Sequence, residues 1–374
     1  MSTTNPTDYL SAIKGLDEDF QSYAIIAFTF IILIIFIGYV IYLTKLEKGQ
    51  CSYMNNLYSS INGNIRSINS SDSDCSGNLY DYYIKTAYNA CSGGSYKNNF
   101  VDVCNLKAVI GQGVRCLDFE IYSIDSQPVV ATSTNDSYYI KETFNSVPFG
   151  TVMDTINGYA FSGGTCPNPT DPLIIHLRIK SNNQKMYTNL ANIFKSYPNL
   201  MLGKDYSFEN SGKNLGATPL LSLKNKVILI VDKTNNSFLH NEEFLEYVNL
   251  TSNSIFMRAY NYYNVKNSPD TQELTNYNKT GMTIVFPDSG SAPGNPSGLL
   301  CRNYGCQMVA MRYQLVDNFL MESTGFFDEC GYAFCLKPAA LRNQPVTIAA
   351  PTPQNPQYSY ATRTVSTDYY SFKT

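Results

Sequence analysis

The feature that most restricts the fold of this chain is an uncharged apolar run of 21 residues, from Tyr23 to Leu43, which reads YAIIAFTFIILIIFIGYVIYL. A helix of about 20 apolar residues crosses the hydrocarbon core of a bilayer, and tyrosines near both of its ends suit the membrane interface. A cleaved signal peptide would need a basic segment before the run, whereas four acidic side chains precede it against the single Lys14. The sequence therefore predicts a short acidic N-terminus over 1–22 and a transmembrane helix over 23–44.

The charges beside the apolar run bear on its orientation. Lys14 precedes it and Lys45 and Lys48 follow it, so the positive-inside rule favours a cytosolic side for everything after the helix. The ten cysteines, and N-x-S/T triplets, would instead suit a lumenal or extracellular domain. The triplets begin at Asn69, Asn135, Asn235, Asn249 and Asn278. Because such triplets arise by chance in a chain rich in Asn and Ser, we expect a cytosolic C-terminal domain.

Two polar segments border the rest of the chain. Residues 45–80 are rich in Ser, Asn, Gly and Asp and lack apolar periodicity, so they are expected to form a spacer between membrane and domain. Residues 343–374 contain four prolines and several tyrosines with no helical period. This tail cannot build a core of its own, and we expect it to be extended, either disordered or laid along a partner.

Between these segments, over residues 81–342, short β-branched runs alternate with helical stretches. Runs such as KVILIVDK and DPLIIHLRIK are almost continuously apolar, which is typical of parallel strands covered on both faces. The alternation predicts an α/β fold, a TIM-type (β/α)8 barrel, with an open doubly wound sheet as the alternative. Helices are expected over 149–161 and 184–196, and strands over 82–86, 115–122, 129–132, 173–180, 226–232, 254–259, 283–286 and 308–314.

The composition excludes several functions. The net charge is −3, from 27 Lys and Arg against 30 Asp and Glu, so the chain lacks the basic field that holds nucleic acid. No G-x-G-x-x-G or Walker loop follows a predicted strand, which leaves dinucleotide and P-loop nucleotide cofactors without support. With only 2 histidines, any His-based chemistry must use His176 and His240. We therefore expect no cofactor, no metal ion and no nucleic-acid partner.

Several segments together resemble one enzyme family. They are YYIKTAYNACS at 82–92, GQGVRCLDFEIYSID at 111–125, DPLIIHLRIK at 171–180, GCQMVAMRYQ at 305–314 and ECGYAFCLKPAALR at 329–342. Their order and separations are similar to those of the X and Y boxes of phosphoinositide-specific phospholipases C. The resemblance covers roughly residues 81–342 and implies a TIM-type barrel assembled from an X half and a Y half.

The same resemblance implies which residues would carry catalysis. Members of that family cleave phosphatidylinositol lipids with two histidines, acting as general base and general acid, and a bound Ca2+. The segments that hold these histidines correspond to Ala87-Tyr88-Asn89 and Ala131-Thr132-Ser133, so Tyr88 and Thr132 stand at the two histidine positions. A phenol with a pKa near about 10 and an alcohol cannot exchange protons in this way at neutral pH.

The calcium site of the family is also altered. By the resemblance, Asn89, Asp118 and Glu120 fall on ligand positions, whereas Arg178 falls on the position of a glutamate ligand. A guanidinium among the ligands repels a divalent cation. We therefore expect Arg178 to occupy the place of the metal ion and to pair with Asp118 or Glu120. Both the histidine positions and the calcium-ligand positions differ from those of the family, whereas the segments that form the barrel are similar. This combination indicates a pseudoenzyme.

The remaining histidines and cysteines are expected to be structural. His176 lies two residues before Arg178 on the same strand and therefore on the same face, where a hydrogen-bonded core histidine is favoured, and His240 lies in a polar loop. Four cysteines with paired x4 spacing raise a zinc site as an alternative, namely Cys301, Cys306, Cys330 and Cys335. Structural zinc sites use tighter spacing, so buried thiols or a disulfide are favoured.

Three functional hypotheses follow from these observations. The first is a membrane-anchored structural or interaction protein, with the lipid bilayer and proteins as partners through the barrel surface and tail. One setting for it is the internal membrane of a large DNA virus, where the domain would face the capsid of the virion as a minor capsid protein. The second is a phosphatidylinositol phosphodiesterase with non-standard catalytic residues, and the third is an inositol- or lipid-binding module.

Overall fold

The computed structural model describes residues 18–137, 139–344, 351–353, 355, 358 and 360–374. The chain divides into two units, Met1–Arg342 and Asn343–Thr374, and each is described by itself. Residues 1–17, which make up most of the predicted acidic N-terminus, lie outside the described residues.

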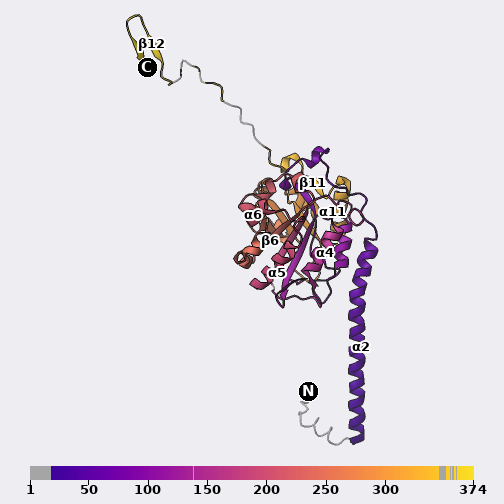
Figure 1. Cartoon of the computed structure of the whole chain (residues 1–374). Coiled ribbons are helices and arrows are strands. Elements are labelled where there is room, and N and C mark those ends of the chain that lie inside the picture. Colours follow the sequence, from indigo (N-terminus) through magenta and orange to yellow (C-terminus); the bar gives the residue numbers. More distant parts are fainter. Residues whose placement is uncertain (1–17, 138, 345–350, 354, 356–357, 359) are drawn as a thin grey trace, which may run out of the picture. The chain divides into compact units, whose positions relative to one another are not determined.

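Eight parallel strands form a nearly closed barrel in the order β7-β6-β5-β2-β1-β10-β9-β8. Figure 1 shows strands inside the first unit with helices around them. The junction between the X-like and Y-like halves is β1 beside β10, where Ile84 is in register with Met308. The TIM-type barrel is confirmed, and the doubly wound alternative is wrong. The strands are β1 Tyr82–Ala87, β2 Cys116–Ile124, β5 Leu173–Ile179, β6 Val227–Asp232, β7 Leu250–Ser252, β8 Met257–Asn261, β9 Met282–Phe286 and β10 Met308–Met311.

Helices cover the outside of the barrel. In α5 the Asn183 side chain accepts a hydrogen bond from the Lys185 backbone N–H at the start of the helix, and Met186, Leu190 and Phe194 recur at four-residue spacing on its buried face. The helices are α3 Val103–Gly111, α4 Phe149–Tyr159, α5 Gln184–Lys195, α6 Ser207–Ser211, α7 Glu242–Leu245, α8 Tyr262–Lys266, α9 Thr271–Tyr277, α10 Gly298–Asn303 and α11 Asn318–Cys330. The two helices predicted from the sequence are α4 and α5.

The predicted strand at 129–132 is present, but the ring of eight differs from the predicted strand set in two details. The run at 129–132 belongs to β3, Gln127–Ala131, which pairs antiparallel with β2 as a hairpin and with the short β4, Val147–Pro148, outside the ring of eight. The eighth barrel strand is instead β7, which at three residues is too short to give a periodic signal. A further short strand, β11 Phe334–Leu336, pairs antiparallel with β1.

Side chains alternate between two apolar clusters along each barrel strand. In β5, Ile174 packs in the barrel interior, whereas Ile175 and Leu177 pack against the helices. His176 and Arg178 share the inward face of Ile174, because side chains of a strand repeat every two residues. This alternation turns polar side chains of β2 and β5 into the barrel and places them near the ends of the strands.

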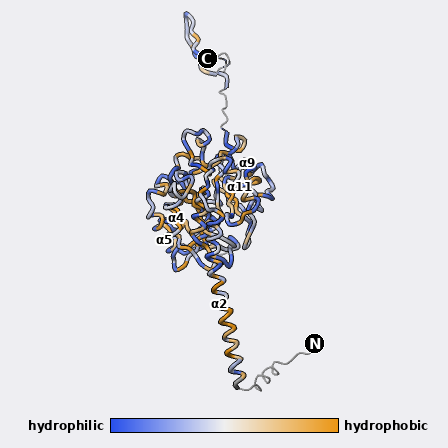
Figure 2. Tube along the Cα trace, turned by 90° about the vertical axis from the view of Figure 1, so that its right-hand side faces the viewer, coloured by the Kyte–Doolittle hydropathy of each residue, from blue (hydrophilic) through white to orange (hydrophobic). Residues whose placement is uncertain are grey.

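The apolar run forms part of a longer helix, α2, Glu18–Leu57. It is the one helix among the described residues that is long and apolar enough to cross a membrane, and its most apolar 18-residue stretch has a mean hydropathy of 3.0 (Figure 2). The helix continues for more than three turns beyond the predicted span, and its last turns pack on the barrel. Met54 is fully buried there, and the adjoining Tyr58 donates a hydrogen bond to the Tyr313 carbonyl at 2.7 Å.

The segment 45–80, which was expected to form a spacer between membrane and domain, is instead packed on the barrel at several points. Beyond α2 the chain packs on the barrel through separate apolar side chains, with Ile65, Ile68 and Leu79 buried, and it includes two short 3-10 helices, Ser73–Cys75 and Leu79–Asp81. The Ile68 backbone N–H donates to Asp171 at 2.8 Å. These residues follow no period because each fills its own site, so sequence periodicity does not reveal them.

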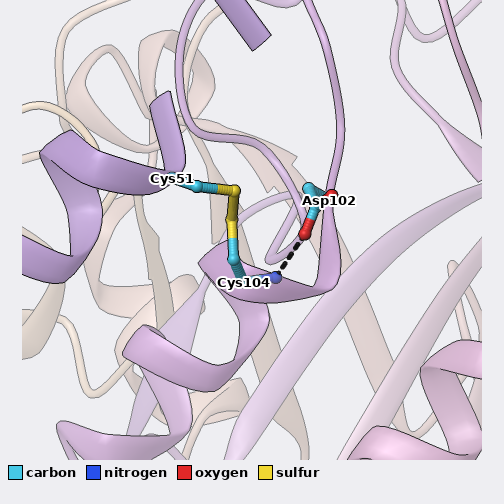
Figure 3. Close-up of side chains that lie close together, drawn as sticks. All are labelled: Cys51, Asp102 and Cys104. Carbon is cyan, nitrogen blue, oxygen red and sulfur yellow. Dashed lines mark hydrogen bonds between the residues drawn. A yellow bond between two sulfur atoms is a disulfide. The ribbon is translucent and has the colours of Figure 1, made fainter. Parts of the chain in front are cut away.

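A disulfide joins α2 to the first helix of the barrel. Cys51 of α2 bonds to Cys104 near the start of α3 (Figure 3). In the same view, Asp102 accepts a hydrogen bond from the Cys104 backbone N–H at 2.6 Å and so caps α3. A second disulfide joins Cys330, the last residue of α11, to Cys335 in β11.

The second unit, Asn343–Thr374, contains a two-stranded hairpin, β12 Thr364–Ser366 and β13 Ser371–Lys373. Its strands were not expected from the sequence. Val365 lies opposite Phe372, and the Tyr370 and Phe372 rings are 6.2 Å apart. The strand residues are exposed, in agreement with a segment that builds no core of its own.

Candidate functional site at the barrel mouth

Four residues singled out from the sequence meet at the C-terminal mouth of the barrel. Asp118 and Glu120 alternate with outward-facing apolar residues of β2, and Arg178 of β5 is in register with Glu120. Asn89 follows β1 in a left-handed backbone conformation with φ 45°, which turns the chain over the end of the strand. All four side chains are buried.

The Arg178 guanidinium lies at the centre of this cluster. Its Nε and Nη2 donate to the two carboxylate oxygens of Asp118 at 3.0 and 2.7 Å, a bidentate arrangement. Nη2 also donates to the Asn89 side-chain oxygen at 3.1 Å, and Nη1 lies 3.1 Å from Glu120 Oε1. The expected pairing of Arg178 with these carboxylates is thus present, and one guanidinium contacts all three residues that the resemblance places at calcium-ligand positions.

The charges of the cluster stabilise one another. Burial raises the pKa of the Asp118 carboxyl, but Arg178 and the hydrogen bond from His176 outweigh burial and hold that pKa well below its ordinary value. Burial disfavours the charged form of Arg178, yet the surrounding carboxylates raise its pKa above the usual value. Arg178 also pairs with Asp136 from the loop after β3. The residues do not fit a bound Ca2+, because a permanent cation already neutralises the oxygens that would hold it.

His176 continues the network deeper into the barrel. Its Nδ1 lies 2.8 Å from Asp118 Oδ1, and its Nε2 lies 2.9 Å from the Ser252 hydroxyl oxygen at the end of β7. This order of contacts is that of a serine-hydrolase triad. All three side chains are, however, completely buried, and Asp118 is shared with Arg178. His176 is therefore a buried, hydrogen-bonded core histidine, as expected, and His240 is exposed.

Tyr88 and Thr132 are both buried at the mouth. The Tyr88 ring packs edge-on against Tyr96, with centroids 5.3 Å apart, and its face lies 4.6 Å from the Arg178 guanidinium carbon. Burial raises the pKa of the Tyr88 phenol well above its ordinary value, so it holds its proton at neutral pH. The Thr132 hydroxyl donates to the Tyr96 carbonyl at 3.0 Å. Neither side chain is arranged to accept a proton from a substrate.

Sequence reasoning missed several members of the site. Asp136 lies in an irregular loop and gives no pattern that would reveal it, and Ser252 lies on a strand too short to recognise. Lys180 could have been found, because it lies two residues after Arg178 and so shares its face. It donates to the Asp136 carbonyl, and burial together with the nearby Arg178 lowers its pKa.

A cavity of about 180 Å³ opens beside the cluster. Its walls are mainly polar and include Asp136, Arg178, Lys180, Asp232 and Asn253. Binding sites for drug-sized ligands usually enclose roughly 300–1,000 Å³, so this cavity is small. It suits a small polar group better than a large ligand.

The cysteines form no free metal-binding site in the part of the chain that the structure describes. Cys51, Asp102 and Cys104 lie close enough to bind a metal ion, but the two sulfurs are joined and Asp102 caps α3 (Figure 3). The alternative zinc set does not remain available, since Cys330 and Cys335 form a disulfide while Cys301 and Cys306 are buried free thiols.

Comparisons with known families and structures agree with this architecture. The model of the phosphatidylinositol-specific phospholipase C X domain matches residues 75–233, and that of the Y domain matches residues 224–340. No curated protein matches the sequence. Among solved structures, PLC21 of L. pealei matches with a TM-score of 0.58 and 19% identity, and PLC21 of S. officinalis with 0.57 and 18%. Each match covers 72% of this chain and 38% of the other, so the chain spans well under half of these proteins.

Proposed function

The chain belongs to the phosphatidylinositol-specific phospholipase C family, and on this premise we propose that it is a membrane-anchored interaction protein whose barrel has lost catalysis. The observation that carries the proposal is the Arg178 guanidinium, bonded to Asp118, Glu120 and Asn89 together. It supplies the positive charge at this point of the barrel without an exchangeable ion. The site therefore keeps its fold and lacks the means to activate a hydroxyl.

The two residues that stand at the family's histidine positions support the same conclusion. General acid and base groups work best when their pKa lies near the operating pH. Burial moves the pKa of the Tyr88 phenol further from neutrality, and the Thr132 hydroxyl is engaged with a backbone carbonyl. The fully buried Ser252 does not replace them, because a lipid phosphate cannot reach it.

An activity assay tests this proposal directly. The full chain is reconstituted in vesicles containing phosphatidylinositol, and release of the head group is measured with Ca2+ and with chelator. The triple variant Tyr88→His/Thr132→His/Arg178→Glu is assayed in parallel, to ask whether the barrel regains turnover. We expect no release by the natural chain under either condition. Calcium-dependent release by the natural chain would refute the loss of catalysis.

Binding of a small polyol without turnover is the second candidate function, and the polar cavity favours it. Asp232, Asn253 and Lys180 line the cavity and offer both donors and acceptors for hydroxyl groups. Its small volume favours a free inositol or sugar ring over a whole lipid. Thermal-shift measurements with myo-inositol separate this function from a purely structural one, because a ligand that binds only the folded state raises the melting temperature.

Anchoring is the remaining part of the proposal. The length and apolar character of α2 support a single-pass span, and Lys45 and Lys48 support a cytosolic side for the barrel. Two disulfides favour an oxidising compartment instead, so a protease-protection assay on sealed vesicles is the decisive measurement of sidedness. The barrel and the tail would then engage a protein layer over the membrane, such as a viral capsid. Absence of the chain from purified particles would refute that setting.

A further inference from the structure

A second cavity lies on the outside of the barrel. It has a volume of about 220 Å³ and is bordered by the end of α5, the segment that follows α5 and the segment that precedes β7. Met201 lines it and is in register with Val227, the first residue of β6, so the cavity lies toward the N-terminal ends of the strands, away from the mouth. It shares no lining residue with the cavity at the mouth. The apolar part of its lining consists of Pro198, Met201, Leu202 and Tyr247.

The lining of this cavity is held in place from behind. The Tyr247 ring stacks on Phe194, with ring centroids 5.9 Å apart. Asn249, a polar lining residue, donates to the Tyr206 carbonyl at 3.1 Å and accepts a hydrogen bond from the Leu229 backbone N–H at 2.8 Å. Because these side chains are already ordered, a partner that enters the cavity does not lose affinity by ordering them.

One side of the cavity is formed by a strained segment. Ser207 lines the cavity and is followed by four non-glycine residues in the left-handed backbone region, with φ between 53° and 55°. Such a conformation persists only where surrounding contacts impose it, and it is concentrated at binding and switch sites. Here the Glu209 backbone N–H donates to the Val248 carbonyl at 2.8 Å, and the Thr251 hydroxyl donates to the Glu209 carboxylate at 2.6 Å. These contacts hold the segment in its strained form beside the cavity.

The border of the cavity carries an excess of positive charge. Lys195, the last residue of α5, and Lys204 both line the cavity and are exposed, against the single carboxylate of Glu246. Within the part of the chain that the structure describes, neither lysine forms an ion pair. Both ammonium groups can therefore pair with negative charges on a molecule that covers the cavity.

The size of the cavity distinguishes two kinds of occupant. Pockets for drug-sized ligands enclose roughly 300–1,000 Å³, so a cavity of about 220 Å³ suits a group no larger than one large side chain. Protein interfaces place aromatic anchors in rigid pockets of this kind and surround them with a polar rim. The volume and the charged border together favour a protein partner.

We propose that this cavity is a docking site for a protein partner, which inserts one aromatic side chain and pairs adjacent acidic residues with Lys195 and Lys204. The inference rests on the proposed interaction function, for which it supplies the site and the chemistry of the partner. Met201, Leu202 and Tyr247 contact the inserted ring, and the two lysines select for negative charge beside it.

Fluorine NMR on the full chain in nanodiscs of neutral lipid tests the docking site. The probe is the peptide acetyl-Asp-Phe-Asp-amide with a fluorine on the phenylalanine ring, whose signal broadens when the peptide binds. A fluorinated peptide with Lys in place of both Asp residues tests the charge preference. An unlabelled peptide with Ala in place of Phe is added as a competitor and tests the need for the ring. Empty nanodiscs give the background.

The test variant is Lys195→Glu/Lys204→Glu. The matched control is Lys185→Glu/Lys266→Glu, which changes the net charge equally at two exposed lysines outside the cavity. Because all four lysines are exposed, both variants should melt at the temperature of the natural chain. A change in peptide binding then reports the cavity and not the fold.

We expect the natural chain and the control variant to bind the acidic peptide, and Lys195→Glu/Lys204→Glu to bind it about tenfold more weakly, since attraction is replaced by repulsion. No broadening beyond that of empty nanodiscs, equal binding by both variants, equal binding of the basic peptide or displacement by the Ala peptide would each overturn the docking site. Binding of free 3-(4-fluorophenyl)propionate without binding of the peptide would assign the cavity to a small molecule and also overturn it.

The vesicle assay for head-group release separates this inference from the proposed loss of catalysis. Head-group release by a chain that binds the peptide would overturn the loss of catalysis and leave the docking site intact. A chain that neither releases the head group nor binds the peptide would overturn the docking site alone.

Discussion

Replacing Arg178 by methionine removes the charge at the centre of the barrel mouth with little change in side-chain length. Asp118 and Glu120 are at most 1% exposed, and both would lose the guanidinium that neutralises them. Breaking a buried ion pair by removing one partner costs about 3–5 kcal/mol, because the remaining charge is left without compensation. We expect the free energy of unfolding of Arg178→Met to fall by about this amount at pH 7.

Denaturant unfolding of the full chain in detergent micelles measures this change. Arg258→Met is the matched control, because Arg258 forms a bidentate pair with the half-exposed Glu273 at 2.7 and 2.8 Å on the surface of the barrel. Exposed pairs contribute about 0–1 kcal/mol, so the control should lose little. Arg178→Lys retains the charge without the planar fork and should fall between the two. Equal losses for Arg178→Met and Arg258→Met would refute the role of Arg178 as the internal counter-charge.

Calcium provides an independent check of the same reasoning. Arg178→Glu places a third carboxylate beside Asp118, Glu120 and the Asn89 side-chain oxygen, which together resemble an oxygen-rich Ca2+ site. We expect Ca2+ to raise the melting temperature of Arg178→Glu and to leave that of the natural chain unchanged. A cation that binds only the folded state at about 100 times its Kd stabilises by roughly 2.7 kcal/mol. An unchanged melting temperature of Arg178→Glu in Ca2+ would argue against the inference that Arg178 occupies the place of a metal ion.

Three further outcomes follow from the structure. Burial raises the pKa of the Asp171 carboxyl to about 6, so the stability gained from its protonated form is complete below about pH 4 and is lost as the pH rises through 6. In urea unfolding, the free energy of unfolding of the natural chain should fall by about 3 kcal/mol over this pH range, and that of Asp171→Asn should not. Reduction of Cys51–Cys104, which spans 53 residues, should lower the free energy of unfolding by up to about 4 kcal/mol, and Cys51→Ser should reproduce this loss without reductant. Met54→Ala should destabilise the chain by about 2–5 kcal/mol if α2 packs on the barrel as described, and a loss below about 0.5 kcal/mol would contradict that packing.

The barrel could be predicted because the sequence contains both the long apolar runs of its strands and the segments that resemble the phospholipase C family. Strand β5 reads as a continuous apolar run, and its two-residue alternation was enough to place Arg178 beside His176 on the inward face. The pairing of Arg178 with Asp118 followed from the resemblance together with opposite charge. Asp136 and Ser252 were not predictable, because one lies in a loop and the other on a three-residue strand. Their positions depend on long-range packing that leaves no local pattern.

The packing of the last turns of α2 on the barrel was not predicted from the sequence, for a different reason. A helix that packs on a domain with only its last two turns presents few apolar positions there, and in this chain those turns contribute Gln50 and Met54 among polar neighbours. Composition therefore indicated only a spacer, although a polar segment can be fixed to a domain by a disulfide and by isolated buried side chains.

The proposed loss of catalysis is compatible with retention of the barrel, because catalysis and folding depend on different parts of each strand. The apolar residues of β2 and β5 fill the interior and the outer layer, whereas chemistry in such barrels is confined to the last inward positions at the mouth. At those positions a metal site of oxygen ligands is stable only with a cation, and emptying it would leave buried carboxylates unpaired. Arg178 supplies a cation as part of the chain itself, so under the function proposed above the fold does not need Ca2+ at this point.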